Sequence, residues 1–387
     1  MHMDPLLPQL TLVLAVLLAL AWLSRRLNQP SPVVYLIAGL LVGPEVLDVI
    51  PDQEALHRAG EFGVLLLLFF LGTEIKLPAL LKDWRLPVIG TALQIGLSVL
   101  VAAAVGTAFD WSTPRIVLLG FVISLSSTAL VLPLLDARSE RDTAIGQDVV
   151  SVLLAQDLAV APMLVVLALL SGHSPSSGEV ALQLGGAVAL LGLVLFVGLR
   201  GRIQLPGMGQ LAKDREYQVF GALLLAMLLA TFSGWMGLST AFGAFVGGLV
   251  VGASDDSDWV HHSLDPLRVL LVAVFLMAIG AMVQLDFFWA HATEVTLLAL
   301  AALGVNTVVN ALALRANGRT WRNALYGGGL LAQIGEFSFV LAAVGAESSI
   351  ITDQGYQMAL SVIAMTLVMG SLWVSAVSRL TGHATPR

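Results

Sequence analysis

The sequence predicts an all-α polytopic membrane protein, and three observations support that fold class. Of the 387 residues, 57% are hydrophobic and 12% are charged, whereas soluble domains carry about 25% charged residues. Apolar stretches follow one another along the whole chain, and many approach the length of about 20 residues that a membrane-spanning helix needs. The Lys and Arg residues fall mainly in alternate connections between these stretches, as the positive-inside rule requires.

The composition also excludes several classes of function. With no Cys, the chain has no disulfide, thiolate metal site, iron–sulfur cluster or cysteine nucleophile. A net charge of -7 offers no basic surface, so we expect no nucleic-acid partner. No nucleophile, metal cluster or pair of acids converges in the sequence, and we therefore expect neither an enzyme nor a bound cofactor.

We predict about thirteen transmembrane helices, with the N-terminus outside and the C-terminus in the cytoplasm. No Lys or Arg precedes the first apolar run, whereas Arg25 and Arg26 follow it, so this run is not a cleavable signal peptide. The alternation then places every Lys and Arg except Arg58 and Arg115 inside, and a missed span would reverse all later loops. The segments are 5–23, 32–47, 60–75, 86–109, 115–135, 145–170, 180–199, 217–235, 238–252, 267–283, 295–314, 324–346 and 356–377.

The odd number of segments suggests one transmembrane domain, residues 1–387, that contains two halves of six helices. We predict a first repeat at 5–170, a linker helix at 180–199 and an inverted second repeat at 217–377. No similarity between residues relates the halves, so this division is an architectural inference. No loop is long enough to form a cytoplasmic regulatory domain.

Two acidic residues lie deep in predicted spans: Asp157 in 145–170 and Glu336 in 324–346. An acid at such a depth is costly and is a functional candidate. Because burial penalises the charged carboxylate, we expect Asp157 to exchange its proton at cellular pH. An alkali cation, K+ or Na+, is the alternative occupant, and a site that holds either a proton or a cation is the core of an exchanger. The structural alternative is a permanently protonated Asp157 that joins two helices by hydrogen bonds.

Two predicted spans carry residues that interrupt a helix in mid-membrane. Four hydroxyl residues within 124–128 precede Pro133, which cannot donate to the helix ladder. Three glycines at 327–329 precede a polar stretch, and two breaks at the midplane would bring opposed helix dipoles together beside the ion site. Helix packing at the glycines and hydroxyl bonds to the preceding turn are the alternatives. The expected crossover residues are Ser126, Ser127, Thr128, Gln333, Gly335 and Glu336.

Seven stretches in order form a pattern that none of them would establish alone. They are PVVYLIAGLLVGP at 32–44, GEFGVLLLLFFLGTE at 60–74, SLSSTAL at 124–130, Gln156 with Asp157, GLSTAFGAFVGG at 237–248, DPLRVL at 265–270 and AQIGEFSF at 332–339. This pattern covers nearly the whole chain and resembles the membrane domain of the Kef-type potassium/proton antiporters, in monovalent cation:proton antiporter family 2.

The resemblance implies an inverted-repeat fold like that of the sodium/proton antiporter NhaA, a homodimer and elevator-like alternating access. It assigns the ion site to Gln156 and Asp157, with crossed broken helices at 126–128 and 333–336. A single titrating Asp beside a neutral Gln implies electroneutral, one-for-one exchange.

Two features depart from the Kef pattern. A lysine usually lies nine residues before the terminal arginine of helix eleven, but that position, counted from Arg315, is Asn306, which we regard as the coupling position. Kef-type members also continue into a nucleotide-binding regulatory domain that senses glutathione. The sequence ends at Arg387 without one, so we expect either a truncated chain or the loss of that control, with a separate cytoplasmic regulatory subunit as a further candidate partner.

We therefore predict a secondary active antiporter of the bacterial inner membrane that exchanges K+ or Na+ for H+ at Asp157, with a role in pH homeostasis. A cation channel is one alternative, although the sequence contains no filter resembling TVGYG. A sensor without transport on the same fold is the other alternative, and it would tolerate Asp157→Asn.

Overall fold

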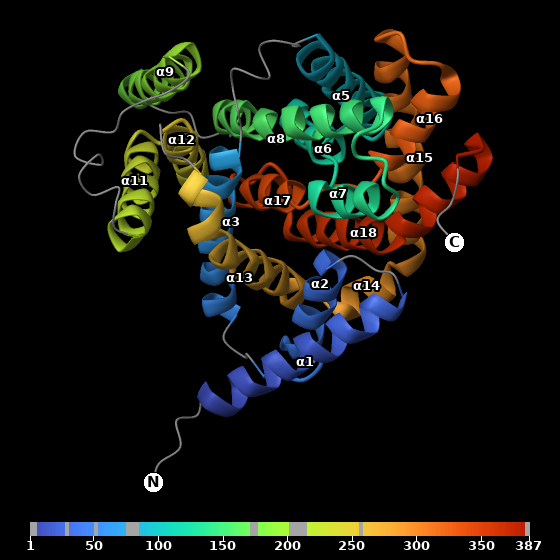
Figure 1. Cartoon of the computed structure of the whole chain (residues 1–387), viewed down its shortest axis with the longest axis horizontal. Helices are drawn as coiled ribbons and strands as arrows, with labels where there is room; N and C mark the ends of the chain where they lie inside the picture. The colour runs from blue at the N-terminus through green and yellow to red at the C-terminus, as the bar shows by residue number, and fades with distance from the viewer. Residues whose placement is uncertain are drawn as a thin grey trace. The chain divides into compact units, whose positions relative to one another are not determined.

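The computed structural model describes residues 6–27, 31–49, 53–74, 85–170, 177–200, 215–254 and 258–383, and these are almost entirely helical (Figure 1). They contain no β-strand, and an isolated antiparallel bridge joins Ser126 and Ile334. The all-α prediction is therefore confirmed. The helices are α1 (Leu6–Leu27), α2 (Ser31–Val42), α3 (Gln53–Glu74), η1 (Arg85–Gly90), α5 (Thr91–Ala108), α6 (Thr113–Ser124), α7 (Thr128–Ala137), α8 (Ala144–Leu170), α9 (Ser177–Arg200), α11 (Arg215–Trp235), α12 (Thr240–Gly252), α13 (Asp258–Met282), α14 (Leu285–Ala290), α15 (Ala292–Ala316), α16 (Trp321–Leu330), α17 (Phe337–Glu347) and α18 (Asp353–Thr381).

Each of the thirteen predicted segments contains a helix. Five helices within the described ranges are long and apolar enough to cross a membrane, and shorter apolar helices accompany them. The number of spans and their direction remain predictions. Residues 1–5 and several basic residues that support the predicted direction lie outside the described residues, namely Lys76, Lys82, Arg202, Lys213 and Arg387.

The chain divides into two compact units. The first consists of Met1–Gly60, Arg85–Gln156 and Leu276–Arg387, and the second of Glu61–Trp84 and Asp157–Phe275. The boundary falls within α8, between Gln156 and Asp157. Both units take segments from both predicted halves, so the relation between the halves remains a prediction.

In the second unit, close helix contacts depend on small side chains. α11 packs against α12, and the cluster between them and α3 contains Phe69, Ala226 and Ala244, all buried. A Cβ atom at Gly248 of α12 would collide with the backbone carbonyl of Phe69 in α3. The glycines of α12 therefore allow two helix backbones to approach closely, as small residues do in membranes.

The first unit contains both interrupted helices. α6 packs against α5 and α17, while α16 packs against α15 and α18. One buried cluster joins α7, α16, α18 and the N-terminal half of α8 through side chains that include Leu135, Val152, Leu330 and Val374. This cluster holds the helix ends close to the two breaks in a fixed arrangement.

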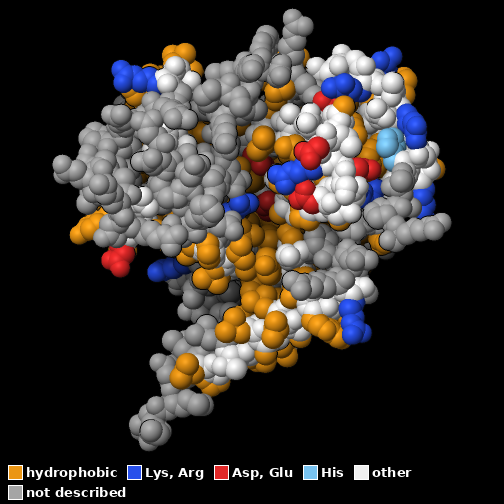
Figure 2. All heavy atoms as spheres, in the orientation of Figure 1, with side chains coloured by type: hydrophobic (Ala, Val, Ile, Leu, Met, Phe, Trp, Pro, Cys, Tyr) orange, Lys and Arg blue, Asp and Glu red, His pale blue; other side chains and the backbone are white. Residues whose placement is uncertain are grey.

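The surface of the first unit differs from that of a soluble protein. Leu14, Leu18 and Trp22 of α1 are exposed, and Figure 2 shows hydrophobic side chains along this helix. Acidic and basic side chains gather instead over α7 and its connection to α8 (Figure 2), where Arg141 and Asp136 form an ion pair of 3.2 Å. Exposed apolar helices and charged connections are what a bilayer environment requires.

Candidate functional site

The first interruption separates α6 from α7. Leu125 and Ser127 have extended backbones, and the Ser127 hydroxyl accepts a hydrogen bond of 3.3 Å from the backbone N–H of Leu130 as the N-cap of α7. Thr128 is already the first residue of α7, and Pro133 lies inside that helix. The break therefore precedes the proline by two turns and coincides with the serines.

The second interruption separates α16 from α17 and meets the first in an antiparallel crossing. The N–H of Gly335 donates to the carbonyl of Leu125 at 2.9 Å, and the N–H of Ser127 donates to the carbonyl of Gln333 at 3.2 Å. These bonds satisfy backbone groups that lipid could not satisfy. Two helix breaks that would each be costly alone therefore stabilise each other.

A chain of buried amides connects this crossing to α8. The Oε1 atom of Gln156 accepts a hydrogen bond of 3.0 Å from the backbone N–H of Ser126. Its Nε2 donates to Oε1 of Gln94 at 3.2 Å, and Nε2 of Gln94 donates to the Ser124 carbonyl at 2.8 Å. Both amides are fully buried. Asp157 is the next residue of α8 and is 2% exposed.

Gln94 was missed in the sequence analysis. The available signal was a lone amide in the apolar run of α5, since a polar side chain at such a position needs a buried partner. Its partner in α8 lies 62 residues later. Only the fold shows that the two amides meet.

The hydroxyls at the crossing bind groups of the other broken helix. Ser127 Oγ donates to Oε2 of Glu336 at 3.2 Å, and Ser126 Oγ donates to the carbonyl of Leu331 at 2.8 Å. Glu336 is the N-cap residue of α17 and is 8% exposed. The partial positive charge at this helix N-terminus favours an anionic side chain there.

Amide side chains of α15 also bind at the C-terminal end of α16, where the helix dipole places a partial negative charge. Nδ2 of Asn306 donates to the Ala332 carbonyl at 3.0 Å, and Nδ2 of Asn310 lies 3.4 Å from the Leu331 carbonyl. The structure thus places Asn306 at the crossing. Neutral amides from α15, rather than a cationic side chain, donate to these two carbonyls.

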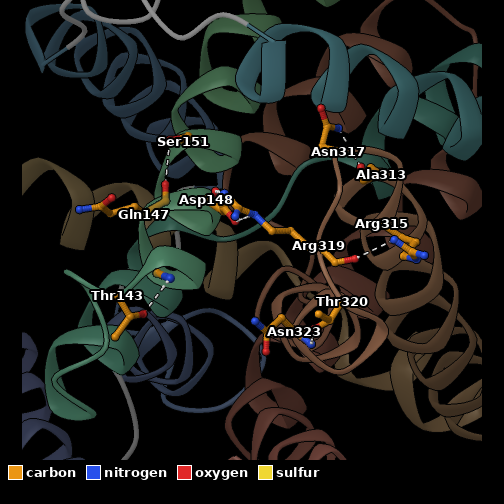
Figure 3. A network of polar contacts seen from close by, with 11 residues as sticks. Thr143, Gln147, Asp148, Ser151, Ala313, Arg315, Asn317, Arg319, Thr320 and Asn323 are labelled. Carbon is orange, nitrogen blue, oxygen red and sulfur yellow. Dashed lines mark hydrogen bonds and ion pairs between the residues drawn. The ribbon is translucent and has the colours of Figure 1, made fainter.

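An ion pair fixes the N-terminal part of α8, two turns before Gln156 (Figure 3). Arg319, in the connection between α15 and α16, donates from a terminal guanidinium nitrogen to Oδ1 of Asp148 at 2.7 Å. Its own carbonyl accepts a bond of 3.2 Å from Arg315 (Figure 3). Asp148 is 6% exposed, so Arg319 supplies the charge that its burial requires.

The predicted crossover residues all lie at or beside the observed breaks, and Gln156 and Asn306 bind backbone groups there. Asp157 lies across the boundary between the units, so the structure gives its burial and its neighbour in α8 but not its place relative to the crossing. Its role as the ion-binding residue remains a prediction.

An all-helical membrane protein whose buried polar groups gather at two crossed helix breaks belongs to the class of secondary transporters with discontinuous helices. The chain is a member of the sodium/hydrogen exchanger transmembrane family, whose model matches residues 12–380. Together with the similarity to K+ efflux antiporters given next, this match confirms the Kef-type cation:proton antiporter membrane domain predicted from the motifs.

The relatives differ in the ion for which they are named. The iron transporter MagA of Paramagnetospirillum magneticum is 34% identical over 96% of this chain and 86% of its own length. K+ efflux antiporters 6 and 5 of Arabidopsis thaliana are each 29% identical over 88% of this chain. The chain spans only 58% and 61% of those two relatives.

Solved structures support the fold. The sodium proton antiporter MjNhaP1 from Methanocaldococcus jannaschii at pH 8 has a TM-score of 0.66 and 19% identity, over 98% of this chain and 99% of that chain. An electron-microscopy structure of the same antiporter has a TM-score of 0.64 over the full length of both chains. The chain therefore has an all-α membrane antiporter fold.

Proposed function

We propose that this protein exchanges a monovalent cation, K+ or Na+, for H+ across the bacterial inner membrane, one for one, at Asp157. The observation that supports this most is the hydrogen bond of 3.0 Å between the Ser126 N–H and Gln156. It attaches the residue before Asp157 to a helix break, in a member of the sodium/hydrogen exchanger family. We include a homodimer, elevator-like movement, an external N-terminus and a cytoplasmic C-terminus in the proposal.

The exchange follows from competition for one carboxylate. A proton neutralises Asp157 and permits reorientation in one direction, and a bound cation permits the return. The empty, charged carboxylate does not cross, because burying an uncompensated charge in the bilayer is costly. Both loaded forms carry the same net charge, so the cycle is electroneutral.

Alkali cations fit the chemistry of the crossing. Its side chains offer amide, hydroxyl and carboxylate oxygens, which hard cations prefer, and the chain contains no Cys. The relatives of this chain include an iron transporter and K+ efflux antiporters. The test of function therefore includes Fe2+.

The test measures proton flux in proteoliposomes with a pH dye inside, after pulses of K+, Na+, Fe2+ or choline. Asp157→Asn is compared with the wild type and with Asp286→Asn, the same change at an exposed acid of α14. We expect a K+- or Na+-dependent pH change that Asp157→Asn abolishes and Asp286→Asn keeps. An ionophore that clamps the voltage should leave the rate unchanged.

Other results would refute the proposal in distinct ways. Exchange at the wild-type rate in Asp157→Asn would remove Asp157 as the site. Cation conductance without a pH change would indicate a channel, and a lack of any flux would indicate a sensor on the same fold.

A further inference from the structure

Two fully buried amide side chains at the crossing have only one of their two polar atoms bonded. Asn306 is 1% exposed and its Nδ2 donates to the Ala332 carbonyl at 3.0 Å. Gln333 is fully buried and its Nε2 donates to the Gly370 carbonyl at 3.3 Å. Within the part of the chain that the structure describes, Asn306 Oδ1 and Gln333 Oε1 have no hydrogen-bond partner.

The orientation of both amides follows from their neighbours. Each NH2 group faces a backbone carbonyl, which only accepts hydrogen bonds, so rotating the amide would bring two oxygens together. The unbonded atom is therefore the oxygen in each case. Gln94 and Gln156, which are equally buried, have both polar atoms bonded.

The two oxygens belong to one part of the first unit. Asn306 is bonded to the carbonyl of Ala332, and Gln333 is the next residue of the chain. Gln333 follows the C-terminal end of α16, a ten-residue helix whose last carbonyls carry partial negative charge, and Asn306 of α15 reaches the same end through its Nδ2. The groups that donate to the carbonyls of Leu331 and Ala332 are uncharged side chains.

Buried acceptors beside a negative helix end lack a positive partner. A cation that has shed part of its water takes amide and carbonyl oxygens as ligands. We propose that Asn306 Oδ1 and Gln333 Oε1 are ligands of the transported monovalent cation at the crossing, within the first unit. This inference rests on the proposed exchange and names the residues that set its cation affinity.

The experiment measures two quantities for K+ and Na+: the rise in melting temperature of the detergent-solubilised protein on adding the cation, and the KM for the cation in proteoliposomes. Asn306→Leu and Gln333→Met remove the oxygens. Gln357→Met is the matched control, because this amide of α18 donates to the Met282 carbonyl and accepts from the Gln284 N–H. Choline at the same ionic strength corrects for general salt effects.

We expect the loss of one oxygen ligand to raise the cation KM about tenfold in Asn306→Leu and in Gln333→Met. The cation-induced rise in melting temperature should shrink in both variants and persist in Gln357→Met. A purely structural role would lower the melting temperature without cation and leave its response to cation intact. That result would overturn the inference. It would indicate that a buried water, and not the cation, binds the two oxygens.

Asn306→Asp tests the same ligand if Asn306→Leu does not fold. Asn306→Asp retains an oxygen and adds negative charge, so we expect a lower cation KM than in the wild type. An unchanged KM would contradict the inference. Wild-type exchange that Asp157→Asn abolishes, together with unchanged cation affinity in the Asn306 and Gln333 variants, would leave the proposed function standing and refute this assignment alone.

Discussion

Replacing Gly335 with Ala tests the crossing where the two breaks come closest. A Cβ atom on this residue would lie 2.6 Å from the carbonyl oxygen of Ser126, and 3.2 Å from the nitrogen of Ser127. Ordinary van der Waals contact begins at 3.4 Å. The two segments would therefore have to separate by about 0.8 Å, the difference between 3.4 and 2.6 Å.

This separation strains the two backbone hydrogen bonds of the crossing, from Gly335 to Leu125 and from Ser127 to Gln333. Overpacking of a filled interior costs about 1–3 kcal/mol, and each buried backbone group that loses its partner costs about 1–3 kcal/mol more. The reduced entropy of the unfolded chain offsets roughly 0.4–1 kcal/mol. With one backbone group losing its partner, we expect a net loss of about 1–6 kcal/mol in the free energy of unfolding.

The assay combines thermal unfolding in detergent, followed by tryptophan fluorescence, with cation-dependent proton flux in proteoliposomes. Gly304→Ala is the matched control, because a Cβ on this residue of α15 meets no atom within 4 Å. We expect Gly304→Ala to unfold at or slightly above the wild-type temperature and to keep its flux. Gly335→Ala should unfold several degrees lower and lose flux. Wild-type stability and flux in Gly335→Ala would refute the close crossing.

Three further predictions concern groups of the first unit. Gln94→Leu leaves Nε2 of Gln156 without its acceptor. We therefore expect a loss of about 1–3 kcal/mol in the free energy of unfolding and slower proton flux. Unchanged flux would show that the amide chain does not position α8. Arg319→Gln leaves the buried Asp148 without its ion pair and should lower the melting temperature. Adding Asp148→Asn should restore the melting temperature in the double variant. A further, additive decrease in melting temperature in the double variant would contradict the pairing. Partial burial lowers the pKa of His383 from 6.5, so the unfolded chain binds this proton more readily. The contribution of His383 to the free energy of unfolding should therefore be fully present above pH 6.5 and decrease as the pH falls below that value. Between pH 7.5 and 5.5, the melting temperature of His383→Gln should decrease less than that of the wild type.

The sequence alone determined the fold class. Long apolar segments with few charges have no stable arrangement in a bilayer except helices or closed barrels, because backbone groups need internal partners. The same reasoning drew attention to polar residues in mid-segment. The structure places those at 124–128 and 333–336 at the two helix breaks.

Local chemistry was a weaker guide to the position of the first break. Pro133 suggested an interruption, yet α7 continues through it. The proline lacks only one backbone hydrogen bond of the helix. The residues at 125–127, by contrast, form hydrogen bonds with the other broken helix, and these compensate for the break. Those compensating bonds come from residues about 200 positions away in the chain, and no local pattern contains them.

Only the tertiary structure decided which amides cooperate. Three amides at the crossing come from three different helices: Gln94, Gln156 and Asn306. Each forms a hydrogen bond with a backbone group that lies at least 26 residues away in the sequence. The sequence gives the number of polar groups that an apolar segment carries, and therefore that each needs a partner. Which partner it finds, and which oxygen remains available to a cation, depends on how the helices pack.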